Sequence, residues 1–171
     1  MLTAEKIKAL LKLEPNTFEG GFFASTYISD INIPEDVLTG IKSASGSRSI
    51  CSAIYYFLEA GTKSVLHKVG SDMIYHFYSG DQVEMLLLYP KGHTPQYEVC
   101  TFGTIAENVF PMKIIPGGTW LGSRLIGKGA YALMGVSMAP GFDKDDYSIG
   151  DQKELIKQYP EASNLIKEFT K

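Results

Sequence analysis

The sequence has few of the residues that mark several common classes of protein. It holds only 2 cysteines in 171 residues, Cys51 and Cys100, and their separation fits neither a metal-binding nor a redox spacing. We expect both to be reduced thiols packed in the fold. Basic residues are not in excess, since 16 Lys and Arg against 19 Asp and Glu give a net charge of −3. Because binding to a phosphate backbone needs a basic surface, we expect no nucleic-acid partner.

Long apolar runs are also missing. No uninterrupted stretch approaches the roughly 18 apolar residues of a membrane span, and the N-terminal segment MLTAEKIKALLKLEP mixes charged and apolar residues instead of carrying the apolar centre of a signal peptide. We therefore expect a cytoplasmic protein that does not bind a membrane. With 44% hydrophobic residues the chain can bury one core, and we expect a single domain over residues 1–171.

The pattern along the chain predicts a helix, a long series of strands and a second helical region. Thr3 is a candidate N-cap for an amphipathic helix over 4–12 that ends before Pro15. Short segments rich in β-branched and aromatic residues follow, separated by Gly, Pro, Asn and Asp. They are 22–29, 49–59, 63–68, 73–79, 83–89, 96–102, 112–115, 119–125 and 131–138. This spacing predicts an all-β sandwich or barrel.

Two other regions complete the expected organisation. Residues 151–170 return to a helical pattern, which Pro160 divides into two pieces. Residues 30–47 form the longest irregular segment, which we expect either to be mobile or to cover one end of the barrel.

A regularly spaced pattern lies in GTKSVLHKVGSDMIYHFYSG, residues 61–80. Gly61, His67, Val69, Met73 and Gly80 stand in the register of the first sequence motif of the cupin superfamily, which this stretch resembles. In cupins that bind a metal, the places of Val69 and Met73 hold His and Glu.

A second stretch resembles the other cupin motif. Residues 116–118 supply its Pro-x-Gly turn, and the place of its histidine ligand falls on Leu121.

Further motifs resemble one family of small cupins of unassigned function, cupin type 5 or DUF985. They are EPNTFEGGFFASTY, Arg48 followed by SAIYYFL, SD–IYHFYSG, IIPGGTW and MAPGFDKDDY, between about residues 13 and 147. The resemblance implies a double-stranded β-helix (cupin jelly-roll barrel) with N-terminal and C-terminal helices, a homodimer, and a relation to the sugar-nucleotide epimerase branch of the superfamily. Met73 and Met112 depart from the family, which usually has Glu and Gln there.

The surviving donor set argues against a metal at the usual cupin position. Of the four ligand places only His67 carries a donor that Zn, Fe, Mn or Ni prefers, and the thioether of Met73 is a weak ligand for them. We therefore expect no metal and no cofactor.

Strand alternation predicts what would line the barrel instead. Residues of one parity share a face of a strand, so an inward His67 predicts an apolar, aromatic pocket for a small hydrophobic or planar ligand. The predicted lining residues are Val65, Met73, Tyr75, Phe77, Met112, Ile114 and Leu121. Arg48 is either an anchor for a carboxylate or phosphate at the mouth or a partner in a surface salt bridge.

His67 has two interpretations. It is either a satisfied core histidine or the base that removes a proton next to a carbonyl, as the resemblance to the epimerase branch implies. The candidate acids are Tyr131 and Tyr75, and the nearest carboxylate in the sequence is Asp72, which also suits a turn-stabilising role.

Three hypotheses for the function follow. The first is a metal-independent isomerase or epimerase acting on a carbonyl or sugar-derived compound, the second a binding or sensing module with an adaptable methionine-lined pocket, and the third a metal-dependent cupin with unusual ligands. The outward residues Ile74, His76 and Tyr78 form a candidate contact stripe for the expected homodimer.

Overall fold

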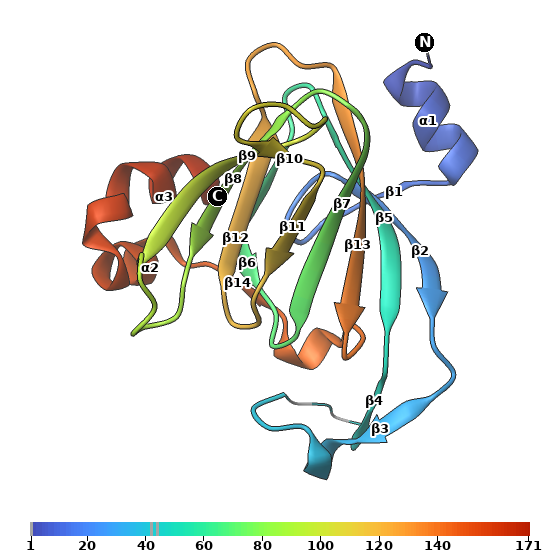
Figure 1. Cartoon of the computed structure of the whole chain (residues 1–171), viewed down its shortest axis with the longest axis vertical. Helices are drawn as coiled ribbons and strands as arrows, with labels where there is room; N and C mark the ends of the chain where they lie inside the picture. The colour runs from blue at the N-terminus through green and yellow to red at the C-terminus, as the bar shows by residue number, and fades with distance from the viewer. Residues whose placement is uncertain (1, 42, 44) are drawn as a thin grey trace.

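Two six-stranded sheets face each other in the computed structural model, which describes residues 2–41, 43 and 45–171. The first sheet, in spatial order, contains β1 (Glu14–Pro15), β2 (Phe22–Ile28), β5 (Ser52–Glu59), β13 (Tyr131–Ala139), β7 (Asp72–Gly80) and β11 (Met112–Ile115). The second contains β10 (Val109–Phe110), β9 (Tyr97–Phe102), β8 (Val83–Leu88), β12 (Trp120–Leu125), β6 (Lys63–Lys68) and β14 (Ser148–Ile149). Figure 1 shows the two layers beside each other, with the second sheet on the left and the first on the right. The predicted all-β jelly roll is confirmed.

The core lies between the two sheets and is made by the inward residues of both. Its buried members include Leu58, Met73, Tyr75, Met85, Leu87, Phe102, Ile115, Leu121, Met134 and Val136. Because period-2 alternation places every second residue on this side, the strands form the sandwich without any long apolar run.

The terminal helices follow the predicted pattern with one difference. Helix α1 (Ala4–Leu11) begins at Thr3, whose side chain accepts a hydrogen bond from the Lys6 N–H at 3.3 Å. The helix ends in a left-handed Lys12 (φ 53°), so this residue and not Pro15 terminates it.

The C-terminal helices α2 (Gln152–Gln158) and α3 (Ser163–Phe169) are separated by a 3-10 turn that begins at Pro160. They cover the outer face of the second sheet (Figure 1), where Leu155, Ile166 and Phe169 pack on Leu66, Leu86 and Leu88. None of the described helices is long and apolar enough to cross a membrane.

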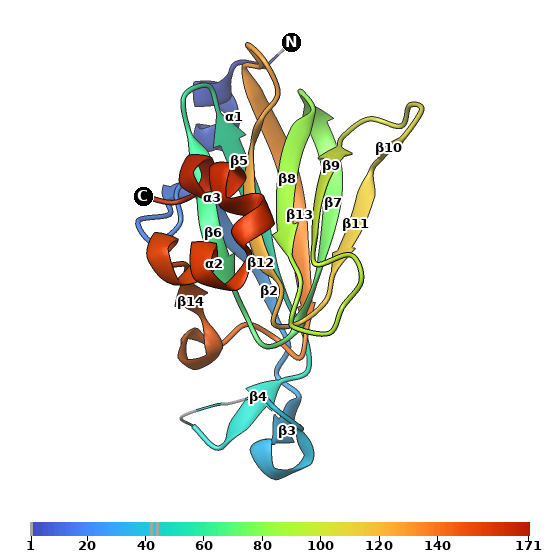
Figure 2. The same cartoon turned by 90° about the vertical axis from the view of Figure 1, so that its left-hand side faces the viewer.

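The irregular segment forms a small arm. It contains β3 (Asn32–Pro34), the 3-10 turn η1 (Glu35–Val37) and β4 (Ser47–Ser49), and β3 and β4 pair as a separate two-stranded sheet. Figures 1 and 2 show the arm projecting beyond one end of the sandwich, so it does not cover that end. Lys42 and Ala44 of this segment lie outside the described residues.

Candidate functional site

His67 lies inside the sandwich on β6, opposite Leu121 of β12, and only 3% of it is exposed. A register shift between β6 and β12 places Ser64 opposite Ser123, as expected for a bulge that breaks the alternation of the strand. His67 Nδ1 lies 2.9 Å from the Val65 carbonyl oxygen. A carbonyl oxygen can only accept a hydrogen bond, so Nδ1 carries a proton, and Nε2 is the nitrogen available for acid–base chemistry.

The Glu19 carboxylate completes the surroundings of the imidazole. Glu19 Oε2 lies 3.3 Å from His67 Nε2 and accepts a hydrogen bond of 2.6 Å from the Tyr147 hydroxyl. The Tyr147 ring stacks on the His67 ring with centroids 5.7 Å apart. Nε2 therefore faces the Glu19 carboxylate, and the Tyr147 hydroxyl is bound to the same carboxylate oxygen.

A tight loop brings Glu19 to this position. The Asn16 side chain accepts hydrogen bonds from the N–H groups of Phe18 and Glu19, and the Glu19 carbonyl accepts one from Val65 N–H at 2.8 Å. Gly20 has φ +102° and lies so close to the Lys63 carbonyl that a side chain there would clash. A glycine is therefore required for the loop to press against β6.

Three phenols surround the Glu19 carboxylate. Burial, followed by the negative charge of Glu19, raises the pKa of Tyr56, Tyr75 and Tyr147 above the usual value of 10.0. All three hydroxyls therefore stay neutral at physiological pH and act as hydrogen-bond donors.

Two buried hydroxyls have no hydrogen-bond partner among the described residues. They are Oγ1 of Thr119, the residue before β12, and Oγ of Ser123 within β12. They share the inward face with Leu121, the residue that faces His67. Leaving a buried hydroxyl unpaired costs about 1–3 kcal/mol. A water molecule or the hydroxyl of a ligand would satisfy them.

Strand alternation predicted part of this interior correctly. Met73, Tyr75 and Leu121 are buried in the core between the sheets, and Phe77 packs against it. Val65 is also buried, but it lies at the bulge and meets His67 through its backbone carbonyl.

Met112 and Ile114 were predicted to line the interior, and the structure shows the opposite. They pair with His76 and Ile74 of β7, and directly paired residues share a face of the sheet. Both side chains are more than half exposed, at 53% and 55%. The pairing of β11 with β7 decides which side chains of β11 face inward. Counting residues along the sequence does not reveal this pairing.

Tyr131 was the first candidate for the acid, but the structure does not bring it to His67. Its neighbours in β13 at positions 132 and 134 point into the core, so Tyr131 points to the outer face, where its ring stacks on Phe57 at 5.5 Å. Of the predicted base and acid, His67 and Tyr131, only His67 belongs to the buried cluster with Glu19 and Tyr147.

Arg48 and Asp72 have structural roles. Arg48 is 2% exposed, pairs with Asp146 at 2.9 Å and donates to the Gly141 carbonyl, so it is neither an anchor at an open mouth nor a surface salt bridge. Asp72 accepts a hydrogen bond of 2.7 Å from Gly117 N–H, which joins the turns of the two cupin-like motifs.

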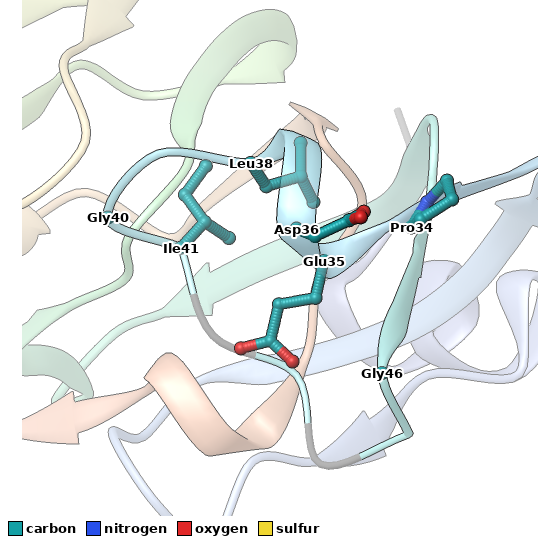
Figure 3. Close-up of a pocket in the computed structure, with 7 residues that line it drawn as sticks. All are labelled: Pro34, Glu35, Asp36, Leu38, Gly40, Ile41 and Gly46. Atoms are coloured by element: carbon teal, nitrogen blue, oxygen red, sulfur yellow. The ribbon is translucent and has the colours of Figure 1, made fainter.

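Two hollows lie away from His67. The larger, about 830 Å³, is on the arm and is lined by Pro34, Glu35, Asp36, Leu38, Gly40, Ile41 and Gly46 (Figure 3). Its labelled carboxylates point in different directions in Figure 3, so they do not converge on one ligand. The smaller, about 210 Å³, lies between β9 and β11.

Comparison with known families now identifies the chain. The model of the cupin superfamily family DUF985 (Cupin_5) matches residues 5–150. The protein belongs to this cupin family. A comparison with curated proteins gives no match.

Solved cupins of similar architecture support the fold. A protein from Shewanella oneidensis is 26% identical over 100% of this chain and 99% of its own, with a TM-score of 0.82. A hypothetical protein from Leishmania major is 23% identical over 99% of both chains, with a TM-score of 0.84. A cupin 2 conserved barrel domain protein from Rhodopseudomonas palustris is 12% identical over 92% of this chain and 87% of its own, with a TM-score of 0.58.

The cupin ligand places do not form a metal site in this chain. Met73 and Leu121 belong to the apolar core, and the described residues contain no group of three His, Cys, Asp or Glu side chains arranged to hold a metal. Glu19 and the Tyr147 phenol are the oxygen groups beside the imidazole, and they are engaged with each other.

Sequence reasoning missed Glu19 and Tyr147. The signal was present in the motifs, because EPNTFEGG contains the glutamate before its two glycines and MAPGFDKDDY ends at the tyrosine. The fold brings these two distant motifs together at one imidazole.

Proposed function

We propose that this cupin binds a small carbonyl or sugar-derived compound between its sheets and isomerises it by proton transfer. The observation that carries the proposal is the buried chain from His67 Nε2 to Glu19 Oε2 to the Tyr147 hydroxyl. Three linked groups that can gain, share and donate a proton are what proton abstraction next to a carbonyl requires.

Each residue has a distinct part in this chemistry. The Val65 carbonyl fixes the imidazole through Nδ1, so Nε2 takes the proton from the substrate carbon and Glu19 stabilises the imidazolium that forms. Tyr147, kept neutral by burial and by Glu19, is the nearest proton donor on the return step. The unpaired hydroxyls of Thr119 and Ser123 supply polar contacts for substrate oxygens.

The substrate would enter beside Tyr147. Its ring meets Phe18 and Phe142 edge-on, with centroids 6.1 and 6.0 Å away, and these two phenylalanines are 67% and 52% exposed. Movement of this aromatic group would open the His67 cluster to solvent.

The test is proton exchange in D₂O, followed by NMR. A panel of ketose and aldose phosphates and nucleotide-linked keto-sugars should contain a compound whose hydrogen next to the carbonyl exchanges in the presence of the protein. The exchange should fall by at least about 100-fold in His67→Ala, because a positioned base contributes about 10²–10⁴. His93→Ala, which removes an exposed loop histidine, is the matched control and should retain the activity.

Unchanged exchange in His67→Ala would contradict the proposal. A compound that binds without exchange and is recovered intact would favour the second candidate, a binding or sensing cupin. The burial of His67 and the unpaired hydroxyls at 119 and 123 suit a retained ligand as well as a substrate.

We further propose that the protein is a homodimer that associates through the outer face of the first sheet. The predicted stripe of Ile74, His76 and Tyr78 is extended by Met112 and Ile114 of the neighbouring strand. This face lies opposite the one that α2 and α3 cover in the second sheet (Figure 2), and an apolar sheet face of this kind is typical of an interface.

A further inference from the structure

The smaller hollow lies where the open edges of the two sheets meet, on the other side of the sandwich from His67. The edge strands β9, β10 and β11 lie side by side in Figure 2. The hollow has a volume of about 210 Å³ and is lined by Glu98, Cys100, Thr101, Phe102, Asn108, Phe110, Met112 and Lys113. At ~30 Å³ per molecule it holds about seven waters, so it suits a ligand the size of one amino acid.

A pair of opposite charges spans the two sheets at this hollow. Lys113 Nζ of β11 lies 2.7 Å from Glu98 Oε1 of β9, and the Tyr89 hydroxyl donates to Glu98 Oε2 at 2.6 Å. Both side chains of the ion pair remain partly exposed, 26% for Lys113 and 34% for Glu98. Burial alone would raise the pKa of Glu98, but the hydrogen bonds from Lys113 and Tyr89 outweigh it and lower that pKa. The glutamate is therefore ionised at neutral pH.

The pair retains hydrogen-bonding capacity of both kinds. An ammonium group has three N–H donors and each carboxylate oxygen has two acceptor sites. Glu98 accepts hydrogen bonds from Lys113, Tyr89 and Cys100, and Lys113 also donates to Cys100, so one acceptor site and one N–H donor remain. The two charges cancel, so the hollow does not favour a ligand of single sign. It favours a ligand that presents a carboxylate to Lys113 and an ammonium to Glu98.

The remaining walls define the other end of the ligand. Phe110 and Met112 are 63% and 53% exposed at the rim, and the Phe102 ring forms part of the lining. Burial raises the pKa of the Cys100 thiol, so this thiol is neutral, hydrogen-bonds with Lys113 and Glu98 and does not act as a nucleophile.

We propose that this hollow binds a free α-amino acid with an apolar or aromatic side chain, its carboxylate on Lys113, its ammonium on Glu98 and its side chain against Phe110. The site is separate from the proton-transfer cluster at His67. It does not depend on the proposed isomerase activity.

Isothermal titration calorimetry with three matched probes tests the proposal. L-Phenylalanine should bind, whereas 3-phenylpropanoate, which lacks the ammonium, and 2-phenylethylamine, which lacks the carboxylate, should each bind at least about tenfold more weakly because each makes only one of the two charge-assisted contacts. No binding of L-phenylalanine, or equal binding of all three probes, would overturn it.

Three substitutions locate the binding. Lys113→Met and Glu98→Gln should each weaken L-phenylalanine binding at least about tenfold, while Lys153→Met, an equivalent loss of charge at an exposed position of α2, should leave it unchanged. His67→Ala should also bind the amino acid normally, so that failure of the isomerase proposal stays distinguishable. Unweakened binding in both Lys113→Met and Glu98→Gln would rule out this hollow.

Discussion

At the scale of single residues, the chemistry of the buried cluster follows from one backbone contact. Because the Val65 carbonyl accepts a hydrogen bond from His67 Nδ1, Nε2 faces Glu19, and burial together with this carboxylate raises the pKa of the neighbouring Tyr147 phenol and keeps it neutral. The motif spacing was enough to predict His67 as the central residue. Its partners were not predictable in this way, since Glu19 and Tyr147 reach the imidazole from two loops that only the tertiary fold brings together.

The raised pKa of Tyr147 gives a prediction with a definite sign. Above about pH 10 the unfolded chain releases the phenol proton and the folded chain retains it, so stability falls as pH rises through that range. Tyr147→Phe should lower the alkaline slope of the unfolding free energy by about one proton, about 1.4 kcal/mol per pH unit. Urea unfolding at a series of values between about pH 9.5 and about pH 11 provides the measurement, and an identical slope in both proteins would contradict the prediction.

At the scale of secondary-structure elements, alternation predicts which residues of a strand share a face. It does not predict which of the two faces points into the core, because that depends on how the strand pairs with its neighbour. Met73 and Tyr75 were placed correctly because they lie within the motif that contains His67. Met112 and Ile114 were not, because their side of the sheet depends on pairing with His76 and Ile74. The bulge in β6 has a similar effect, since it interrupts the alternation within a single strand. Val65, which was predicted to line the interior with its side chain, therefore contacts His67 through its backbone carbonyl.

The ion pair between Arg48 and Asp146 joins two elements, and its burial makes it sensitive to loss of one member. The side chains are 1% and 8% exposed, and Asp146 Oδ1 has no hydrogen bond among the described residues. Arg48→Met should therefore destabilise the protein by about 3–5 kcal/mol, because it leaves a buried carboxylate without its cation.

Urea unfolding would measure this effect against two further variants. The double variant Arg48→Met/Asp146→Leu should recover much of the loss, since replacing both charges removes the unpaired one. Glu168→Gln is the control at an exposed pair with Arg124 and should cost at most about 1 kcal/mol. A loss in Arg48→Met no larger than in Glu168→Gln would show that the buried pair does not hold the arm to the 140–147 segment.

At the scale of the whole molecule, the two sheets differ in what covers them. The second sheet is covered by α2 and α3 through Leu155, Ile166 and Phe169. The first presents Tyr78, Met112 and Ile114 with more than half of each side chain exposed. Local patterns predicted an all-β sandwich or barrel with terminal helices, and the resemblance to cupins implied the jelly roll. The extent of this apolar face emerged only from the pairing of β11 with β7.

Dimerisation through this face gives the prediction for the assembled protein. The wild-type chain should be a dimer by light scattering at micromolar concentration, and Ile114→Arg should raise the dimer dissociation constant at least about tenfold, because a symmetric interface receives the new charge from both copies. Ile105→Arg, the same substitution at a loop residue that is 74% exposed, should remain dimeric. A monomeric wild type, or an Ile114→Arg variant that associates as the wild type does, would exclude this face as the interface.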